Sequence, residues 1–234
     1  MSLLVLVLLT LLSYPLGLAL GQPWLLPLLN AAPAYAVMAS RLRRGDRRGA
    51  AVAMLVWALA LAVAGTVAFS LWPTSPDALV LNGPAYRDEM LHWIRTGEGR
   101  EGSPRLFLLQ HLVHLMAFVV LSLATASTLS LFMGAVLMNY MSFYVASLCR
   151  AGAPGWAVAT MGWHPWAVCR VAAFCLLGVA LAEPLLSRIL RYPYPGLGAS
   201  RALFRLAAAG LLADVVLKAT LAPTWGRMLR SLLG

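Results

Sequence analysis

The sequence predicts an all-α integral membrane protein, a polytopic helix bundle of about six or seven spans in a single domain over residues 1–234. The chain is 61% hydrophobic and only 11% charged, whereas a soluble domain of this length carries about 25% charged residues. Its mean hydropathy is +0.80, so lipid is the expected solvent for most of its surface. The apolar runs are continuous instead of alternating, which favours helices over the strands of a membrane barrel.

The first two apolar segments predict a helical hairpin. Residues 2–20 form the first, and because no basic residues precede it, we expect a retained membrane helix and not a cleaved signal peptide. Residues 21–23 predict a turn. Residues 24–40 predict a second helix, bent but not broken by Pro27 and Pro33, because membrane helices tolerate proline.

Residues 41–48 carry the strongest orientation signal in the chain. Five of these eight residues are Arg, and arginine-rich loops stay in the cytoplasm. The N-terminus is therefore also expected inside, and the bacterial cytoplasmic membrane is the expected location. A third span follows over residues 50–71. Trp72 marks its outer end, since tryptophan favours the membrane interface, and residues 73–76 are expected to break the helix.

An outer loop is predicted over about residues 73–105. It holds five of the eight acidic residues, and four Arg offset them, so its charge fits the outside. Within it, residues 84–96 predict a short amphipathic helix whose apolar face comprises Tyr86, Met90, Trp93 and Ile94. We expect this helix to lie flat on the outer membrane surface. The alternative is a helix that packs on the ends of the loop.

The apolar stretch over residues 106–148 is long enough for two spans, since one span needs about 20 residues. Ser and Thr residues at 122–130 mark the expected turn or break. A sixth span over residues 165–186 then delivers the next arginines to the cytoplasm. The last apolar segment, residues 203–221, contains Asp214 and Lys218. It either spans the bilayer, which we favour, or lies on the inner surface.

All four histidines fall at the same membrane face in this topology: His92, His111, His114 and His164. His111 and His114 are three residues apart and share a helix face. Together with His164 they form a candidate metal site, and a haem is the other cofactor considered. The favoured alternative is that these side chains are interfacial or hydrogen-bonded, because no strict ligand motif is present.

Four polar residues are expected inside the membrane. Asn139 is interpreted as a hydrogen-bonding residue between helices. Arg170 either snorkels to the outer head groups or pairs with Asp214. Asp214 and Lys218 stand at i and i+4 with the acid first, so a pair within one helix is favoured. Glu183, near the inner end of its span, is expected to reach water.

The net charge of +10 is interpreted as a topology signal and a contact with anionic lipid, not as a nucleic-acid surface. The sequence lacks a nucleotide-binding loop and the Gly-x-Ser-x-Gly and His-Glu-x-x-His motifs. The leading hypothesis is a non-enzymatic membrane subunit that assembles with other membrane proteins or supports transport. One alternative is a metal- or haem-dependent enzyme or redox protein. Another is a solute channel or carrier lined by Asn139, Arg170 and Asp214.

Overall fold

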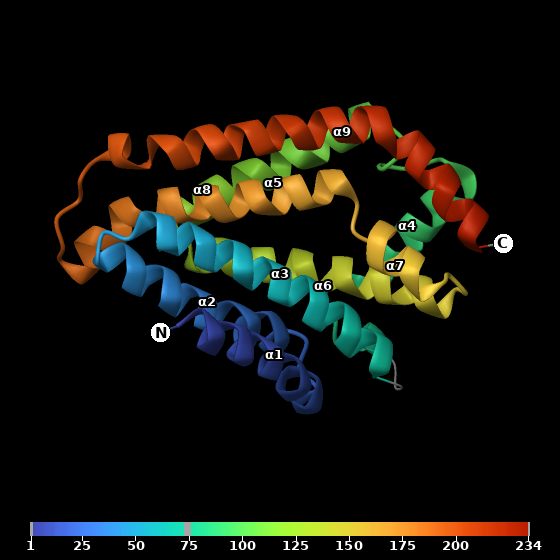
Figure 1. Cartoon of the computed structure of the whole chain (residues 1–234), viewed down its shortest axis with the longest axis horizontal. Coiled ribbons are helices and arrows are strands. Elements are labelled where there is room, and N and C mark those ends of the chain that lie inside the picture. Colours follow the sequence, from blue (N-terminus) through green and yellow to red (C-terminus); the bar gives the residue numbers. More distant parts are fainter. Residues whose placement is uncertain (1, 73–75, 234) are drawn as a thin grey trace.

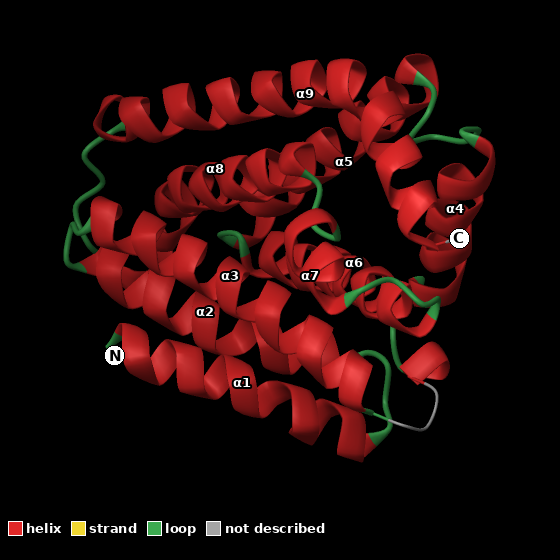
Figure 2. Cartoon of the chain, turned by 45° about the vertical axis from the view of Figure 1, so that its right-hand side comes forward, coloured by secondary structure: helices red, strands yellow, loops and turns green. Residues whose placement is uncertain are grey.

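The computed structural model describes residues 2–72 and 76–233, which form helices and no strand (Figures 1 and 2). The all-helical prediction is therefore confirmed. The three residues at 73–75, within the predicted break after the third span, lie outside the described residues. The α-helices are α1 (Leu3–Leu20), α2 (Leu25–Arg43), α3 (Arg47–Leu71), α4 (Gly83–Thr96), α5 (Pro104–Thr125), α6 (Thr128–Arg150), α7 (Gly155–Met161), α8 (Pro165–Leu190) and α9 (Arg201–Leu233), with short 3-10 helices at Pro76–Ala78 and Leu197–Ser200.

Local capping explains where the first helices begin and end. The Ser2 hydroxyl accepts a hydrogen bond from the Val5 N–H at 3.3 Å at the start of α1. Gly21 ends that helix with φ of +65°, a left-handed conformation that glycine adopts without a Cβ clash. At the start of α3, the Asp46 carboxylate accepts from the Gly49 N–H at 2.8 Å. Side chains thus satisfy backbone donors that a helix start leaves free.

The predicted break in the long apolar stretch is a tight turn between α5 and α6. Ala126 and Ser127 both adopt positive φ there. The Ser127 hydroxyl donates to the Gly178 carbonyl of α8 at 2.7 Å, and the Ser122 hydroxyl donates to Ser130 at 2.8 Å. The polar cluster therefore satisfies the backbone and side chains of the turn, and the prediction of two helices is confirmed.

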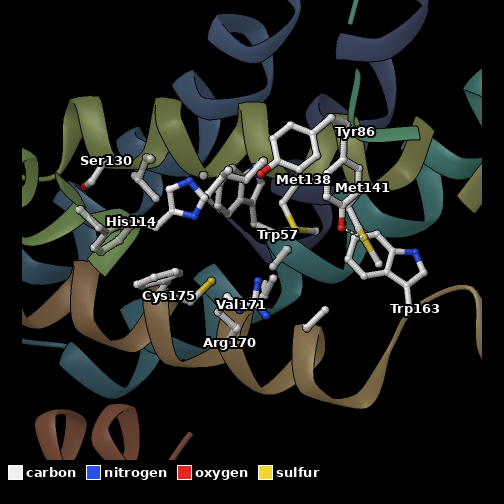
Figure 3. Close-up of a pocket in the computed structure, with 18 of the residues that line it drawn as sticks. Trp57, Tyr86, His114, Ser130, Met138, Met141, Trp163, Arg170, Val171 and Cys175 are labelled. Carbon is white, nitrogen blue, oxygen red and sulfur yellow. Dashed lines mark hydrogen bonds between the residues drawn. The ribbon is translucent and has the colours of Figure 1, made fainter. Parts of the chain in front are cut away.

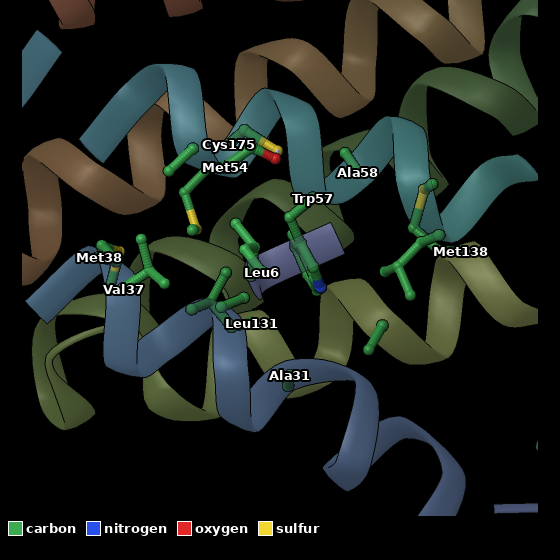
Figure 4. Packing of buried hydrophobic residues seen from close by; sticks show 14 of the residues in the cluster. Leu6, Ala31, Val37, Met38, Met54, Trp57, Ala58, Leu131, Met138 and Cys175 are labelled. Carbon is green, nitrogen blue, oxygen red and sulfur yellow. Dashed lines mark hydrogen bonds between the residues drawn. The ribbon is translucent and has the colours of Figure 1, made fainter. Parts of the chain in front are cut away.

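Four of the long helices, α3, α6, α5 and α8, contact their neighbours in a ring. Helices α1 and α2 pack on α3 at one side, and α9 packs most extensively on α8 at the other (Figure 2). The main apolar core lies among α1, α2, α3 and α6, around buried Leu6, Met38, Met54, Trp57 and Leu131 (Figure 4). The space between the ring helices is the part of the fold that holds the candidate site.

Five helices of the described chain are long and apolar enough to cross a membrane: α1, α3, residues Arg105–Thr125 of α5, α6 and α8. This composition fits a multi-pass integral membrane protein. Helices α2 and α9 are long but less apolar and fall outside that group. They run along the bundle beside the others (Figure 1).

The short helix predicted in the outer loop is present as α4, but its environment differs from the expectation. Met90, Trp93 and Ile94 are at most 2% exposed. They pack with Tyr144 of α6 and Leu229 of α9 in one apolar cluster. The expectation of a helix lying on lipid is therefore wrong, because the bundle itself covers the apolar face. The alternative expectation is a helix packed on the ends of the loop, whereas the observed helix packs on α6 and α9.

The connections gather at two opposite ends of the bundle. The α2–α3 and α8–α9 connections lie at one end, and α4, α7 and the last turns of α9 lie at the other (Figure 1). At the first end Arg47, the first residue of α3, makes a two-pronged ion pair with Glu183 of α8 at 2.8 and 2.6 Å. Glu183 is 1% exposed, so the expectation that it reaches water is wrong. A buried carboxylate needs a partner, and Arg47 supplies one.

Candidate functional site

A two-bond ion pair joins Arg170 of α8 to Asp214 of α9. The Nε and Nη2 atoms of Arg170 donate to the two carboxylate oxygens of Asp214, both at 2.9 Å. Asp214 is fully buried, and this parallel two-bond geometry is the strongest that a carboxylate and a guanidinium form. Of the two arrangements predicted for Arg170, the pair with Asp214 is therefore the one observed.

The favoured pairing of Asp214 with Lys218 is wrong. Lys218 lies one helical turn further along α9, and its Nζ atom contacts the Glu101 carboxylate at 2.8 Å. Glu101 lies in the connection between α4 and α5. Arg170 already donates hydrogen bonds to both oxygens of Asp214. The ammonium of Lys218 therefore pairs with a carboxylate on a different element. A helical i, i+4 spacing contributes little against two buried contacts of this kind.

Glu101 is the main site residue that sequence reasoning missed. One of its oxygens, Oε2, is buried without a hydrogen-bond partner in the described chain. Burial alone would raise the pKa of the Glu101 carboxyl, but nearby positive charges, above all that of Lys218, outweigh it, and the pKa lies below its usual value. The residues around Glu101 are those of an ordinary polar loop. Its position shortly before α5 is the one sequence feature that could have indicated a place in the site.

Phe107 and His111 of α5 complete the cluster. The Nζ atom of Lys218 lies 3.8 Å from the centroid of the Phe107 ring, and the guanidinium of Arg170 lies 5.5 Å from it. Both distances suit cation–π contacts. His111 is buried, and its Nδ1 atom lies 3.1 Å from an oxygen of Asp214. Residues from three helices and one connection thus surround two adjacent ion pairs.

A partly open cavity lies against this cluster, inside the ring of α3, α6, α5 and α8, with about 930 Å³ of unfilled space including its open side (Figure 3). Arg170 points into it from α8 and His114 from α5 (Figure 3). Glu101 and Gln110 also line it. The remaining walls are mainly apolar and aromatic, among them Trp57, Tyr86, Met138, Tyr140, Trp163 and Phe174.

One edge of the Arg170 guanidinium remains free on the cavity side. Its Nη1 atom has no hydrogen-bond partner among residues 2–72 and 76–233, whereas Nε and Nη2 are held by Asp214. The side chain is 25% exposed. A fixed guanidinium with free donors that face a mainly apolar space suits a carboxylate or phosphate group.

The candidate metal ligands occupy separate environments. His111 lies beside Asp214, and His114 lines the cavity. His164 is 1% exposed, stacks on Trp166 at 4.7 Å between ring centroids, and lies 3.4 Å from the Tyr144 hydroxyl. In the part of the chain that the structure describes, no three His, Cys, Asp or Glu side chains are grouped as for a metal ion. The metal and haem hypothesis stays a prediction.

Asn139 lies in an interhelical hydrogen-bond network away from the cavity wall. Its Oδ1 atom accepts from the Tyr14 hydroxyl, and its Nδ2 atom donates to Asn30, both at 2.8 Å. The Asn30 side chain in turn donates to Ser13 at 2.6 Å. This network joins α1, α2 and α6, as expected of a polar residue between membrane helices.

No protein-family model, curated protein or solved structure matches this chain.

Proposed function

We propose that this protein binds an anionic ligand in the cavity beside Arg170 and carries it through the membrane. The observation that carries the proposal is the guanidinium of Arg170, which Asp214 holds on one edge and which faces the cavity with the other. Among the sequence hypotheses, this favours the carrier over the assembly subunit.

The energetics of buried charge support this role. A charged side chain inside a membrane is costly, and such residues commonly mark substrate pathways. If Arg170 had only a structural role, an ion pair that faced away from any cavity would satisfy its hydrogen bonding. Instead, it retains free donors toward a space that also contains His114 and Gln110. An incoming anion would complete the hydrogen bonding of the guanidinium without disturbing Asp214.

We further propose seven spans with the N-terminus in the cytoplasm of a bacterial cell. At about 1.5 Å per residue, the 19 residues of α2 match the thickness of a hydrocarbon core of about 30 Å. The 33 residues of α9 are more than long enough to cross it. Arginine concentration supports the orientation. The end with the α2–α3 and α8–α9 connections carries Arg41, Arg43, Arg44, Arg47, Arg48, Arg188, Arg191, Arg201 and Arg205. The cavity would then lie nearer the outer face.

Two other roles remain proposals. Only 22% of the apolar window of α5 and 33% of that of α1 are buried, which leaves surface for a partner helix and favours an assembly role. Stable co-purification of another membrane protein would support it.

For the metal hypothesis, the expected result is stoichiometric metal or a haem absorption band that disappears in the His111→Ala and His114→Ala double variant.

Proteoliposomes test the carrier proposal, with radiolabelled butyl phosphate as the probe. We expect uptake by the wild type and at least about tenfold less by Arg170→Gln, since hydrogen bonds to charged groups contribute about 1.5–3 kcal/mol. The double variant Arg170→Gln, Asp214→Asn leaves no unpaired buried carboxylate at this position and should show the same loss. Wild-type uptake equal to that of empty liposomes would overturn the proposal.

Arg150→Gln is the matched control, because Arg150 stands at the same end of the bundle but contacts the Phe69 carbonyl and the Phe143 ring outside the cavity. It should transport as the wild type does. An equal loss in this control would assign the effect to lost positive charge near the membrane surface instead of to the cavity.

A further inference from the structure

We infer that the ligand of the cavity is an anionic lipid that enters sideways from the bilayer, with its head group beside Arg170 and an acyl chain in an apolar groove next to the cavity. This inference rests on the proposed ligand-binding role of the cavity. It adds the class of ligand and the route by which the ligand arrives.

The groove lies on the outside of the bundle, between α3, α6, α7 and α8, and has about 1290 Å³ of unfilled space including its open side. Its α3 wall runs from Leu55 to Val67, about 18 Å of helix at 1.5 Å per residue. One leaflet of the hydrocarbon core is about 15 Å deep. The groove therefore has the length of a single acyl chain.

The groove opens toward the surroundings of the bundle. Leu59 is 67% exposed, Val63 is 55% exposed and Val168 is 52% exposed, and all three line it. In a membrane-spanning bundle, exposed apolar side chains of this kind face lipid tails. A lipid in the bilayer would thus reach the groove without crossing water.

The groove and the charged cavity share part of their walls. Ala58, Met138, Trp163 and Val171 line both, and Figure 3 shows Met138, Trp163 and Val171 at the cavity side. Two of the four shared side chains are small or adaptable, since Ala58 ends at Cβ and Met138 is unbranched with several rotatable bonds. Rotation of a few side chains would join the two spaces.

The chemistry of the joined space matches an amphipathic anion. The groove offers an apolar path, and the cavity offers the free edge of the Arg170 guanidinium and the amide of Gln110. The unpartnered Oε2 atom of Glu101, on the same cavity wall, would accept a hydrogen bond from a head-group hydroxyl. A phosphate that carries a hydroxylated substituent satisfies both groups, whereas a wholly water-soluble anion leaves the groove unused.

Lipid retention in nanodiscs tests this inference, with dioleoylphosphatidylglycerol in a dioleoylphosphatidylcholine background as the probe and native mass spectrometry as the readout. We expect the wild type to retain one phosphatidylglycerol in preference to phosphatidylcholine. Val63→Trp, which fills the groove from its exposed side, should reduce that retention about tenfold. Arg170→Gln should remove the preference for the anionic lipid.

Val52→Trp is the matched control, because Val52 is 49% exposed on the same helix but does not line the groove. It should retain the lipid as the wild type does. Val63→Trp should still bind butyl phosphate, since Val63 does not line the cavity. This measurement also shows that the variant folds.

The outcomes separate the two proposals. Butyl phosphate uptake that depends on Arg170, together with phosphatidylglycerol retention that Val63→Trp leaves unchanged, would overturn the lateral route and leave the carrier proposal standing. The absence of both lipid preference and butyl phosphate uptake would overturn both. Equal retention of the two lipids by the wild type would overturn the assignment of an anionic head group.

Discussion

Single residues decide the character of the candidate site. Asp214 takes both of its hydrogen bonds from Arg170, and Lys218 consequently pairs with Glu101. Each of the two carboxylates is thereby matched with one cation. The arrangement is close to neutral, as a cluster among membrane helices needs to be, and it still leaves one guanidinium edge and one carboxylate oxygen unused.

The pairing of Glu101 with Lys218 predicts non-additive effects of mutation. Either Glu101→Gln or Lys218→Met alone should destabilise the protein by about 3–5 kcal/mol, because it strands a buried charge. The double variant should cost much less than the sum. Thermal unfolding in detergent measures all three. Additive losses would show that the two residues do not interact.

The same pair sets a direction for pH dependence. The pKa of Glu101 is lower in the folded protein than in the unfolded chain. Its contribution to stability is therefore complete above the ordinary glutamate pKa and is lost as the pH falls through the lower folded value. Unfolding curves recorded across acidic pH should show a steeper loss for the wild type than for the Glu101→Gln, Lys218→Met double variant.

At the scale of elements, tertiary contacts determine what an amphipathic pattern covers. The apolar stripe of α4 forms as its sequence predicts, but α6 and α9 bury it. Gly226 of α9 approaches Trp93 so closely that a Cβ at this position would lie 3.1 Å from the indole ring. Helix α4 therefore packs over the end of the bundle that also holds α7 and the last turns of α9.

This packing predicts that Trp93→Ala destabilises the protein by about 3–5 kcal/mol, the usual cost of emptying a buried tryptophan site. His92→Ala, at an exposed position of the same helix, should change stability by no more than about 0.5 kcal/mol. Chemical denaturation in detergent compares the two. Equal small effects would indicate a helix held by lipid instead of by protein.

At the scale of the whole molecule, the path of the chain determines which connections share a membrane face. The buried Arg47–Glu183 pair links residues 136 positions apart and fixes the α2–α3 connection beside the end of α8. Helix α9 then returns along α8 to the opposite end (Figure 1). The proposed topology has an even number of membrane crossings between the N-terminus and Arg191, and it therefore puts both on one side.

Cysteine labelling in intact cells checks this topology. Cys149 is exposed near the C-terminal end of α6, and in the proposed topology it should react with an impermeant maleimide. In a Cys149→Ser background, Ser231→Cys should react as well if α9 crosses the membrane. Arg191→Cys should react only after permeabilisation. Labelling of the variants at 191 and 231 from the same side would contradict a spanning α9.

The sequence by itself determined the properties that depend on neighbouring residues. Continuous apolar runs predicted the helices and their lipid environment, the Ser and Thr residues at 122–130 predicted the α5–α6 turn, and a period of 3.6 residues predicted α4. These signals are local, because hydrophobicity and backbone preference act over one or two helical turns.

Only the tertiary structure decided the pairing of charges and the shape of the cavity. Arg170 and Asp214 are 44 residues apart, and nothing local distinguishes that partnership from the Asp214–Lys218 spacing within α9. Glu101 likewise belongs to the site because the fold brings the connection before α5 against Lys218 of α9. Such choices follow from helix placement, because a buried charge pairs with whichever opposite charge the fold brings within hydrogen-bond distance.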